Sequence, residues 1–181
     1  MFRGAATAIL LGISLVPASL AHGQTMTPST YLTTRMKNSA FDNHLGAIYH
    51  QRKIQTASSR INVHIPAVYV YDPSGVLVYA GFDPNQNAVF LGHLPQSAKG
   101  LQKVDGLLER DEVFDAIPDF SSARQRIEQA HHYLVFALTN FPSFMQEAQQ
   151  DNAVRQLGEK STAANSRTIR IDVLQVSLEM K

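Results

Sequence analysis

The stretch INVHIPAVYVYDPSGVLVYAG at residues 61–81 decides the fold, because it is rich in valine, isoleucine and tyrosine. The DPSG segment at 72–75 interrupts it with a proline that presets φ for a turn and a glycine that accepts a positive φ. This pattern predicts a β-hairpin with strands at 61–71 and 76–80. Valines and tyrosines alternate along the first strand, so both of its faces are largely apolar. We therefore expect other elements to cover that strand on both sides.

A second group of elements is predicted near the C-terminus. The run YLVFAL at 133–138 is short and continuously apolar, which is typical of a buried central strand. Apolar side chains at helical spacing predict a helix over 141–157, closed by Gly158. The alternating segment TIRIDVLQV at 168–176 predicts a strand with one solvated face. A strand, a helix and a strand in this order predict parallel pairing through a right-handed crossover.

The rest of the chain is assigned to helices, a loop and an arm. Apolar side chains at helical spacing predict three helices, at 40–57, 101–114 and 123–131. Proline, asparagine and glycine residues make 82–100 a predicted loop. Residues 24–39 are polar and threonine-rich, which predicts an N-terminal arm without a strand. The expected fold class is therefore α/β, with a four-stranded mixed sheet and flanking helices.

The N-terminal segment 1–23 has the pattern of an export signal. A positive start and an uncharged apolar run are followed by small residues that allow cleavage after Ala21 or Gly23. The run is shorter than the ~20 apolar residues that span a bilayer, so we expect cleavage and no transmembrane segment afterwards. The mature chain, 24–181, is expected to be periplasmic or secreted. It is interpreted as a single domain with a helical insertion at 82–131.

Composition excludes several classes of chemistry. The 181-residue chain contains no cysteine, which rules out disulfides, thiol nucleophiles, iron–sulfur clusters and thiolate-bound zinc. Its 16 Lys and Arg residues against 15 Asp and Glu residues give a formal charge of +1, which does not predict nucleic-acid binding. The sequence lacks phosphate-binding glycine motifs, HExxH and calcium-loop patterns. We therefore expect neither a cofactor nor a metal.

The hairpin resembles the second half of a thioredoxin-like domain. In that superfamily a strand opens with a hydrophobic residue and a cis-proline, a turn follows, and the next strand ends near a glycine. The resemblance makes Pro66, preceded by Ile65, the cis-proline, and it makes Gly81 the glycine after the last strand. The family's strand-helix-strand unit normally precedes the hairpin, whereas here it follows. The resemblance thus implies a circularly rearranged domain with the sheet order 168–176, 133–138, 61–71 and 76–80.

The same resemblance implies a binding groove. The segment NFPS at 140–143 falls where the family has Cys-x-Pro-Cys, and its Asn and Ser residues cannot exchange disulfides. The residues expected to line the groove are His64, Ile65, Pro66 and Ala67 on one wall and Asn140, Phe141, Pro142 and Ser143 on the other. The implied function is an exported, non-redox protein-binding or assembly factor. Its expected partner is a protein or an extended peptide, and no residue is assigned as catalytic.

Two other functions remain open from the residues alone. A hydrolase or metal-dependent enzyme would use His64, or else His131 or His132, because neutral imidazole is a common ligand and general base. Adjacent strand residues point to opposite faces, so only one histidine of the pair is expected to join a given site. A triad of Ser143, His64 and an aspartate lacks a G-x-S-x-G frame. The insertion at 82–131 is a further candidate binding surface, since loops commonly carry function.

Overall fold

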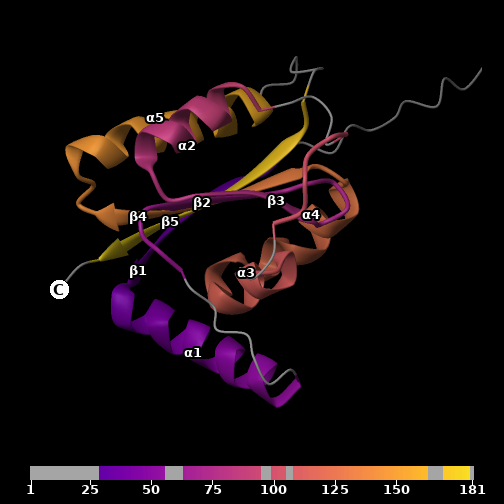
Figure 1. The fold of residues 1–181 in the computed structure, drawn as a ribbon, viewed down its shortest axis with the longest axis vertical. Coiled ribbons are helices and arrows are strands. Elements are labelled where there is room, and N and C mark those ends of the chain that lie inside the picture. The colour runs from indigo at the N-terminus through magenta and orange to yellow at the C-terminus, as the bar shows by residue number, and fades with distance from the viewer. Residues whose placement is uncertain (1–28, 56–62, 95–98, 105–107, 163–168, 180–181) are drawn as a thin grey trace, which may run out of the picture.

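The computed structural model describes residues 29–55, 63–94, 99–104, 108–162 and 169–179. Its strands are β1 (Tyr31–Lys37), β2 (Ala67–Tyr71), β3 (Leu77–Gly81), β4 (Tyr133–Phe141) and β5 (Ile171–Glu179). They form one sheet in the order β1-β5-β4-β2-β3 (Figure 1). β1, β5 and β4 run parallel, whereas β2 is antiparallel to both β4 and β3. The sheet is therefore mixed, as the sequence predicts.

The hairpin of β2 and β3 forms around the DPSG turn, although β2 begins only at Ala67. Gly75 lies at φ 90°, and its N–H donates to the Asp72 carbonyl over 2.8 Å. The Asp72 carboxylate accepts hydrogen bonds from the N–H groups of Ser74, at 2.8 Å, and Val76, at 3.0 Å. The chain reverses here because the aspartate binds its own turn and the glycine tolerates a positive φ.

The predicted strand-helix-strand unit at the C-terminal end is confirmed in its order and its parallel pairing. The helix, however, begins at Met145 rather than at 141, because β4 continues to Phe141. β5 is largely buried on both faces rather than solvated on one. β4 and β5 pair in parallel, and α5 (Met145–Thr162) connects them. The four strands that the sequence predicts lie in the order β5-β4-β2-β3, which is the order expected for them. β2 is buried on both faces, so the expectation that other elements cover it is also confirmed.

β1 corrects two expectations, because the sheet has five strands rather than four and the segment 24–39 does contain a strand. Tyr31–Lys37 pairs with β5 along its whole length. Leu32 and Met36 pack against the core, while the side chains between them are at least partly exposed. A strand at a sheet edge buries only part of its surface, so its sequence has a largely polar composition and resembles an arm.

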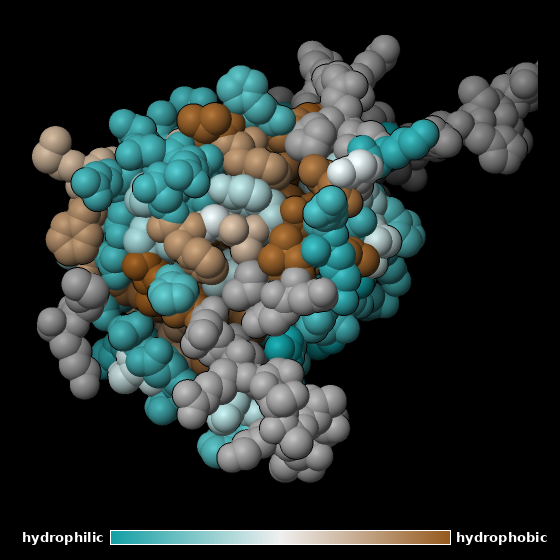
Figure 2. Space-filling model, viewed as in Figure 1, coloured by the Kyte–Doolittle hydropathy of each residue, from teal (hydrophilic) through white to brown (hydrophobic). Residues whose placement is uncertain are grey.

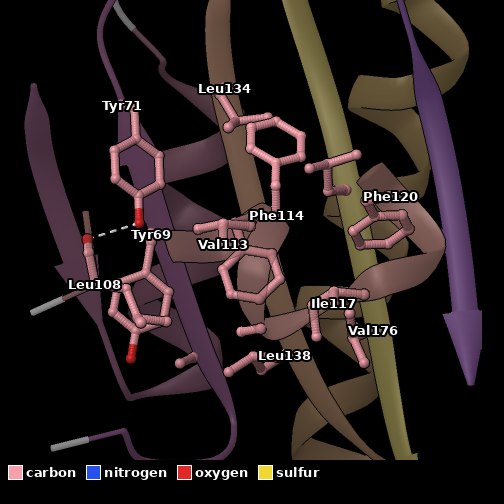
Figure 3. Packing of buried hydrophobic residues seen from close by; sticks show 14 of the residues in the cluster. Tyr69, Tyr71, Leu108, Val113, Phe114, Ile117, Phe120, Leu134, Leu138 and Val176 are labelled. Carbon is pink, nitrogen blue, oxygen red and sulfur yellow. Dashed lines mark hydrogen bonds between the residues drawn. The ribbon is translucent and has the colours of Figure 1, made fainter. Parts of the chain in front are cut away.

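Helices cover both faces of the sheet (Figure 1). One face carries α2 (Pro84–Gly92) and α5, and the other carries α1 (Asn38–Gln55), α3 (Arg110–Ala116), the 3-10 helix η1 (Pro118–Ala123) and α4 (Arg124–Ala130). On the face covered by α1, α3, η1 and α4, buried side chains from 113–120 pack against β2, β4 and β5 (Figure 3). They are Val113, Phe114, Ile117 and Phe120. The helices predicted at 40–57 and 123–131 correspond to α1 and α4.

The segment 82–100, predicted as a loop, contains α2. Pro84 occupies the start of this helix, where a missing N–H costs nothing. The carboxylate of Asp83 caps the helix by accepting a hydrogen bond of 2.8 Å from the Gln86 N–H. The proline that suggested a loop is therefore a helix-start residue.

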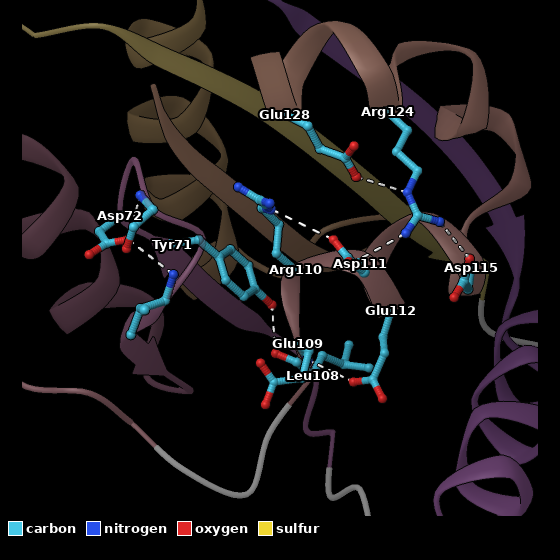
Figure 4. A network of polar contacts seen from close by, with 12 residues as sticks. Tyr71, Asp72, Leu108, Glu109, Arg110, Asp111, Glu112, Asp115, Arg124 and Glu128 are labelled. Atoms are coloured by element: carbon cyan, nitrogen blue, oxygen red, sulfur yellow. Dashed lines mark hydrogen bonds and ion pairs between the residues drawn. The ribbon is translucent and has the colours of Figure 1, made fainter. Parts of the chain in front are cut away.

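Of the described residues within the helix predicted at 101–114, only 110–114 are helical, and they belong to α3. Val104 instead lies beside β3, where its N–H donates to the Leu77 carbonyl over 2.9 Å. Charged side chains then join α3 to α4, and the Arg124 guanidinium lies 3.5 Å from the Asp111 carboxylate (Figure 4). The described parts of 82–131 thus contain helices on both faces of the sheet, with α2 on one face and α3, η1 and α4 on the other.

α5 continues past Gly158, where the pattern predicted its end. Gly158 faces β1 at close range, because a Cβ atom at this position would lie 2.6 Å from Cγ of Tyr31. The glycine therefore marks a contact between helix and strand rather than a helix terminus.

The export signal predicted at 1–23 lies outside the described residues. So do parts of other predicted elements, at 24–28, 56–57, 61–62, 95–98, 105–107 and 168. Among the described residues, none of the helices is both long enough and apolar enough to cross a membrane.

Candidate functional site

The predicted groove residues gather at one end of the sheet. β2 begins near the end of β4, because Ala67 pairs with Leu138 and β4 continues only to Phe141. We call this end of the sheet the rim and define it as residues 63–66, Phe82 and residues 140–145. The peptide bonds Ile65-Pro66 and Phe141-Pro142 are both cis, as the resemblance implies for the first of them.

Exposed apolar side chains concentrate at the rim. Among the described residues, the large hydrophobic side chains that are exposed are Phe82 (39%), Val89 (64%), Phe144 (56%) and Met145 (93%). Three of these four belong to the rim. Tan atoms gather at the left margin of Figure 2, on the side where the arrowheads of β4 and β5 lie in Figure 1. Phe144 and Met145 are consecutive and both exposed, which is more informative than single exposed residues, since those are normal on protein surfaces.

Aromatic contacts position two parts of the rim. The His64 ring packs edge-on against Phe82 with centroids 5.0 Å apart, and Phe82 in turn approaches Tyr69 in the core at 6.3 Å. At the other part, the Arg35 guanidinium of β1 lies 3.8 Å from the centroid of the Phe141 ring. His64 is exposed and accessible, as the groove interpretation requires.

Behind the rim lies a buried carboxylate. Glu147, in the first turn of α5, is only 3% exposed. Its Oε2 accepts hydrogen bonds from the hydroxyl of Thr139 and the N–H of Asn140, both at 3.1 Å, and its Oε1 accepts one from Asn140 Nδ2 at 2.6 Å. Asn140 is therefore turned inward and anchors the end of β4 to α5. Its side chain stabilises the rim rather than presenting a reactive group.

Ser143 is held by a second carboxylate on the same helix. Its hydroxyl donates to Asp151 Oδ2 over 2.5 Å, and Asp151 Oδ1 accepts a bond of 3.2 Å from Gln175 Nε2 on β5. Burial raises the pKa of the Asp151 carboxyl, and the hydrogen bond from Ser143 opposes that rise. Ser143 and Asp151 thus meet directly, while His64 packs on Phe82. The described contacts do not assemble a Ser-His-Asp triad.

A polar chain that the sequence did not reveal connects α5, α2 and the hairpin. Gln150 Nε2 donates to the Leu138 carbonyl over 3.1 Å, and its Oε1 accepts from Asn87 Nδ2 over 2.7 Å. Asn87 Oδ1 accepts from the Tyr79 hydroxyl over 2.9 Å. Gly81 makes room for this chain, because a Cβ at that position would lie 1.9 Å from Asn87 Oδ1. The strand ends behind the rim are therefore fixed by satisfied buried polar groups.

The histidine pair lies at the opposite end of the sheet from His64. His131 ends α4 in a left-handed conformation, with φ 51°. His132 is buried just before β4, and its Nδ1 lies 3.2 Å from Asp172 Oδ2. β4 separates the two ends by roughly 30 Å for its nine residues. His64 and His132 therefore cannot share a site.

The contact between His132 and Asp172 is buried and has a structural role. Both side chains are almost fully buried, at 3% and 2% exposure. Asp172 Oδ1 also accepts a hydrogen bond of 2.6 Å from the Thr30 N–H, just before β1. Burial raises the pKa of the Asp172 carboxyl, while the Thr30 bonds and His132 act against the rise. Within the described ranges, no group of three or more His, Cys, Asp or Glu side chains could hold a metal ion.

No protein-family model, curated protein or solved structure matches this chain. The functional inference therefore depends on the chemistry of the rim itself.

Proposed function

We propose that the protein is an exported, non-redox, thioredoxin-like binding or assembly factor that holds an extended segment of a partner protein at the rim. The observation that carries the proposal is the exposure of Phe82, Phe144 and Met145 at one end of the sheet, where Glu147 and Asn140 form a buried polar contact. The strand order β5-β4-β2-β3 supports the thioredoxin-like part of the proposal. The absence of cysteine from the sequence makes the proposed activity binding rather than disulfide exchange.

The exposed side chains supply the binding energy. Burying a large apolar side chain fully contributes about 1.5–3 kcal/mol. Met145 and Phe144 are 93% and 56% exposed, so a partner that covers them gains most of this contribution from Met145 and about half of it from Phe144. Part of the gain offsets the lost freedom of the partner segment. The apolar character of these side chains favours a partner segment with apolar residues of its own.

The backbone at the rim favours an extended segment. The ladder between β2 and β4 begins at Ala67 with Leu138, so residues 63–66 continue beyond the paired part of β2. β4 continues past Leu138 to Phe141, but the Asn140 N–H is bound to Glu147, and Pro142 has no N–H to continue a ladder. An incoming strand can therefore align with residues 63–65 and add to the sheet by main-chain hydrogen bonds.

The test compares variants at the rim with a matched variant elsewhere. Synthetic peptides of varied apolar content are arrayed and probed with the native chain, with Phe144→Ser/Met145→Ser, and with Val89→Ser. Val89 is a suitable control because it is exposed and apolar but lies on α2 outside the rim. We expect the rim variant to lose binding at least tenfold, because about 1.4 kcal/mol of lost burial suffices for that factor. The Val89 variant should bind as the native chain does.

The location of binding is checked separately by amide chemical shifts. Addition of a selected peptide should shift the amide signals of Ala67 and Asn140, which flank the rim on β2 and β4. If no peptide binds, or if the rim variant and the Val89 variant bind equally, the proposal is wrong.

A further inference from the structure

The outer edge of β1 is an open hydrogen-bonding edge. β1 ends the strand order, so among the described residues it has a strand neighbour only on the β5 side. In Figure 3 it is the outermost strand, drawn in indigo at the right. The edge is seven residues long, and open edges of this length are ready templates for another strand.

The direction of each backbone group follows from Thr30. Its carbonyl accepts a hydrogen bond of 2.8 Å from the Val173 N–H, and its own N–H donates to Asp172, so both groups face β5. Backbone groups alternate along a strand, so those of the odd-numbered residues face away from the sheet. The outward-facing residues of β1 are therefore Tyr31, Thr33, Arg35 and Lys37.

We propose that β1 pairs with β1 of a second copy of this chain, antiparallel and centred on Thr34. In that register the opposite residues are Tyr31 with Lys37, Leu32 with Met36, Thr33 with Arg35, and Thr34 with itself. The outward-facing groups then meet one another, as an antiparallel ladder requires. Each cation lies opposite an uncharged residue, and Leu32 meets Met36 on one face. Such cross-strand pairs stabilise a sheet, whereas like charges directly opposite destabilise it.

Neighbouring registers are less favourable. A shift by one residue places outward-facing groups of one copy against inward-facing groups of the other, so no ladder forms. A shift by two residues in one direction places Arg35 opposite Arg35 of the second copy. The same shift in the other direction pairs only residues 31–35 and leaves Met36 and Lys37 without partners. The sequence of β1 therefore selects the register centred on Thr34.

Charge at the ends of the paired strands supports a second copy as the occupant. Lys37 of the second copy arrives opposite Tyr31. The Tyr31 ring packs against α5 at Gly158, where a Cβ atom would lie 2.6 Å from Cγ of Tyr31, and Glu159 is the next residue of that helix. The Glu159 carboxylate already pairs with Arg155 over 2.6 Å, but it is 57% exposed, so its second oxygen can receive the incoming ammonium group. Two-fold symmetry provides this complementary contact twice.

The absence of cysteine provides a direct test in the full chain. With Thr34→Cys, the two introduced thiols face each other in a non-hydrogen-bonded pair with Cα atoms about 4.5 Å apart, which suits a disulfide. With Lys37→Cys, the thiols lie six residues apart along the ladder, roughly 20 Å, and cannot join. We expect oxidised glutathione to cross-link the Thr34 variant into a covalent dimer and to form no cross-link in the Lys37 variant, as non-reducing gel electrophoresis would show.

Two further measurements test the non-covalent association of two copies through β1. The unaltered chain should sediment as a dimer at micromolar concentration. Thr33→Pro removes an outward N–H that makes no bond within the sheet, so the fold should persist, as far-UV circular dichroism can verify. Two lost interchain bonds should weaken the dimer about thirtyfold. A chain that stays monomeric, or equal cross-linking of the Thr34 and Lys37 variants, overturns the proposal.

Discussion

Replacing Glu147 by alanine should strongly destabilise the protein. The substitution removes the acceptors of three hydrogen bonds, which are donated by the Thr139 hydroxyl and by the backbone and side-chain N–H groups of Asn140. Thr139 is 0% exposed and Asn140 is 9% exposed, so solvent reaches these donors poorly. Each buried donor left without a partner costs about 1–3 kcal/mol. A carboxylate in the first turn of a helix contributes up to about 1 kcal/mol more.

The expected loss in the free energy of unfolding is therefore about 3–5 kcal/mol, after partial compensation by entering water. Urea unfolding followed by far-UV circular dichroism measures it. Gln146→Ala is the matched control, because Gln146 is exposed on the same helical turn. Glu147→Gln should lose less than Glu147→Ala, since its amide oxygen still accepts. If the free energy of unfolding of Glu147→Ala lies within about 0.5 kcal/mol of that of the control, this carboxylate does not anchor the end of β4.

Three other substitutions test the framework around the sheet. Gly81→Ala should lower the free energy of unfolding by about 1–3 kcal/mol, because its Cβ would lie 1.9 Å from Asn87 Oδ1, and thermal unfolding should show a lower midpoint. Gly158→Ala should also lower the free energy of unfolding, because its Cβ would collide with the Tyr31 ring. Loss of this contact between α5 and β1 would appear as faster hydrogen exchange in β1. The Asp172 pKa is raised in the folded state, so its contribution is full at acid pH and is lost as pH rises through the folded value. Asp172→Asn should therefore remove this fall in stability with pH, as urea midpoints across the acid and neutral range would show; an unchanged pH profile would contradict the assignment.

The elements predicted well are those whose local signals and burial agree. The DPSG turn is explained by Asp72 and Gly75 alone, and the apolar run of β4 is central because it is buried along nearly its whole length. β1 was missed because its burial depends on a single strand neighbour that is far away in the sequence. α2 was not predicted because a proline such as Pro84 is typical both of a loop and of the first turn of a helix.

The residues named for the groove lie at one end of the sheet, and whether they form a binding groove stays a prediction. The residues that support them were not identified from the sequence. Glu147, Gln150 and Asp151 are polar, and polar residues on a helix usually face solvent. Their spacing nevertheless carried a signal, because they share a helical stripe with Val154, which is fully buried. Polar residues in line with a buried apolar residue are therefore the pattern that could have indicated the buried framework behind the rim.

A substitution of Arg35 distinguishes the two proposals, because its side chain contacts the rim and its backbone belongs to the edge of β1. Its guanidinium lies over the Phe141 ring of the rim, whereas its backbone lies on the open edge of β1. Arg35→Ala removes the cation–π contact, worth about 0.5–1 kcal/mol, and should weaken peptide binding at the rim about two- to fivefold. Pairing with a second copy uses backbone groups that alanine retains, so cross-linking through Thr34→Cys should be unchanged in this background. Loss of cross-linking with intact peptide binding would show that the Arg35 side chain, not the backbone edge, holds the two copies together.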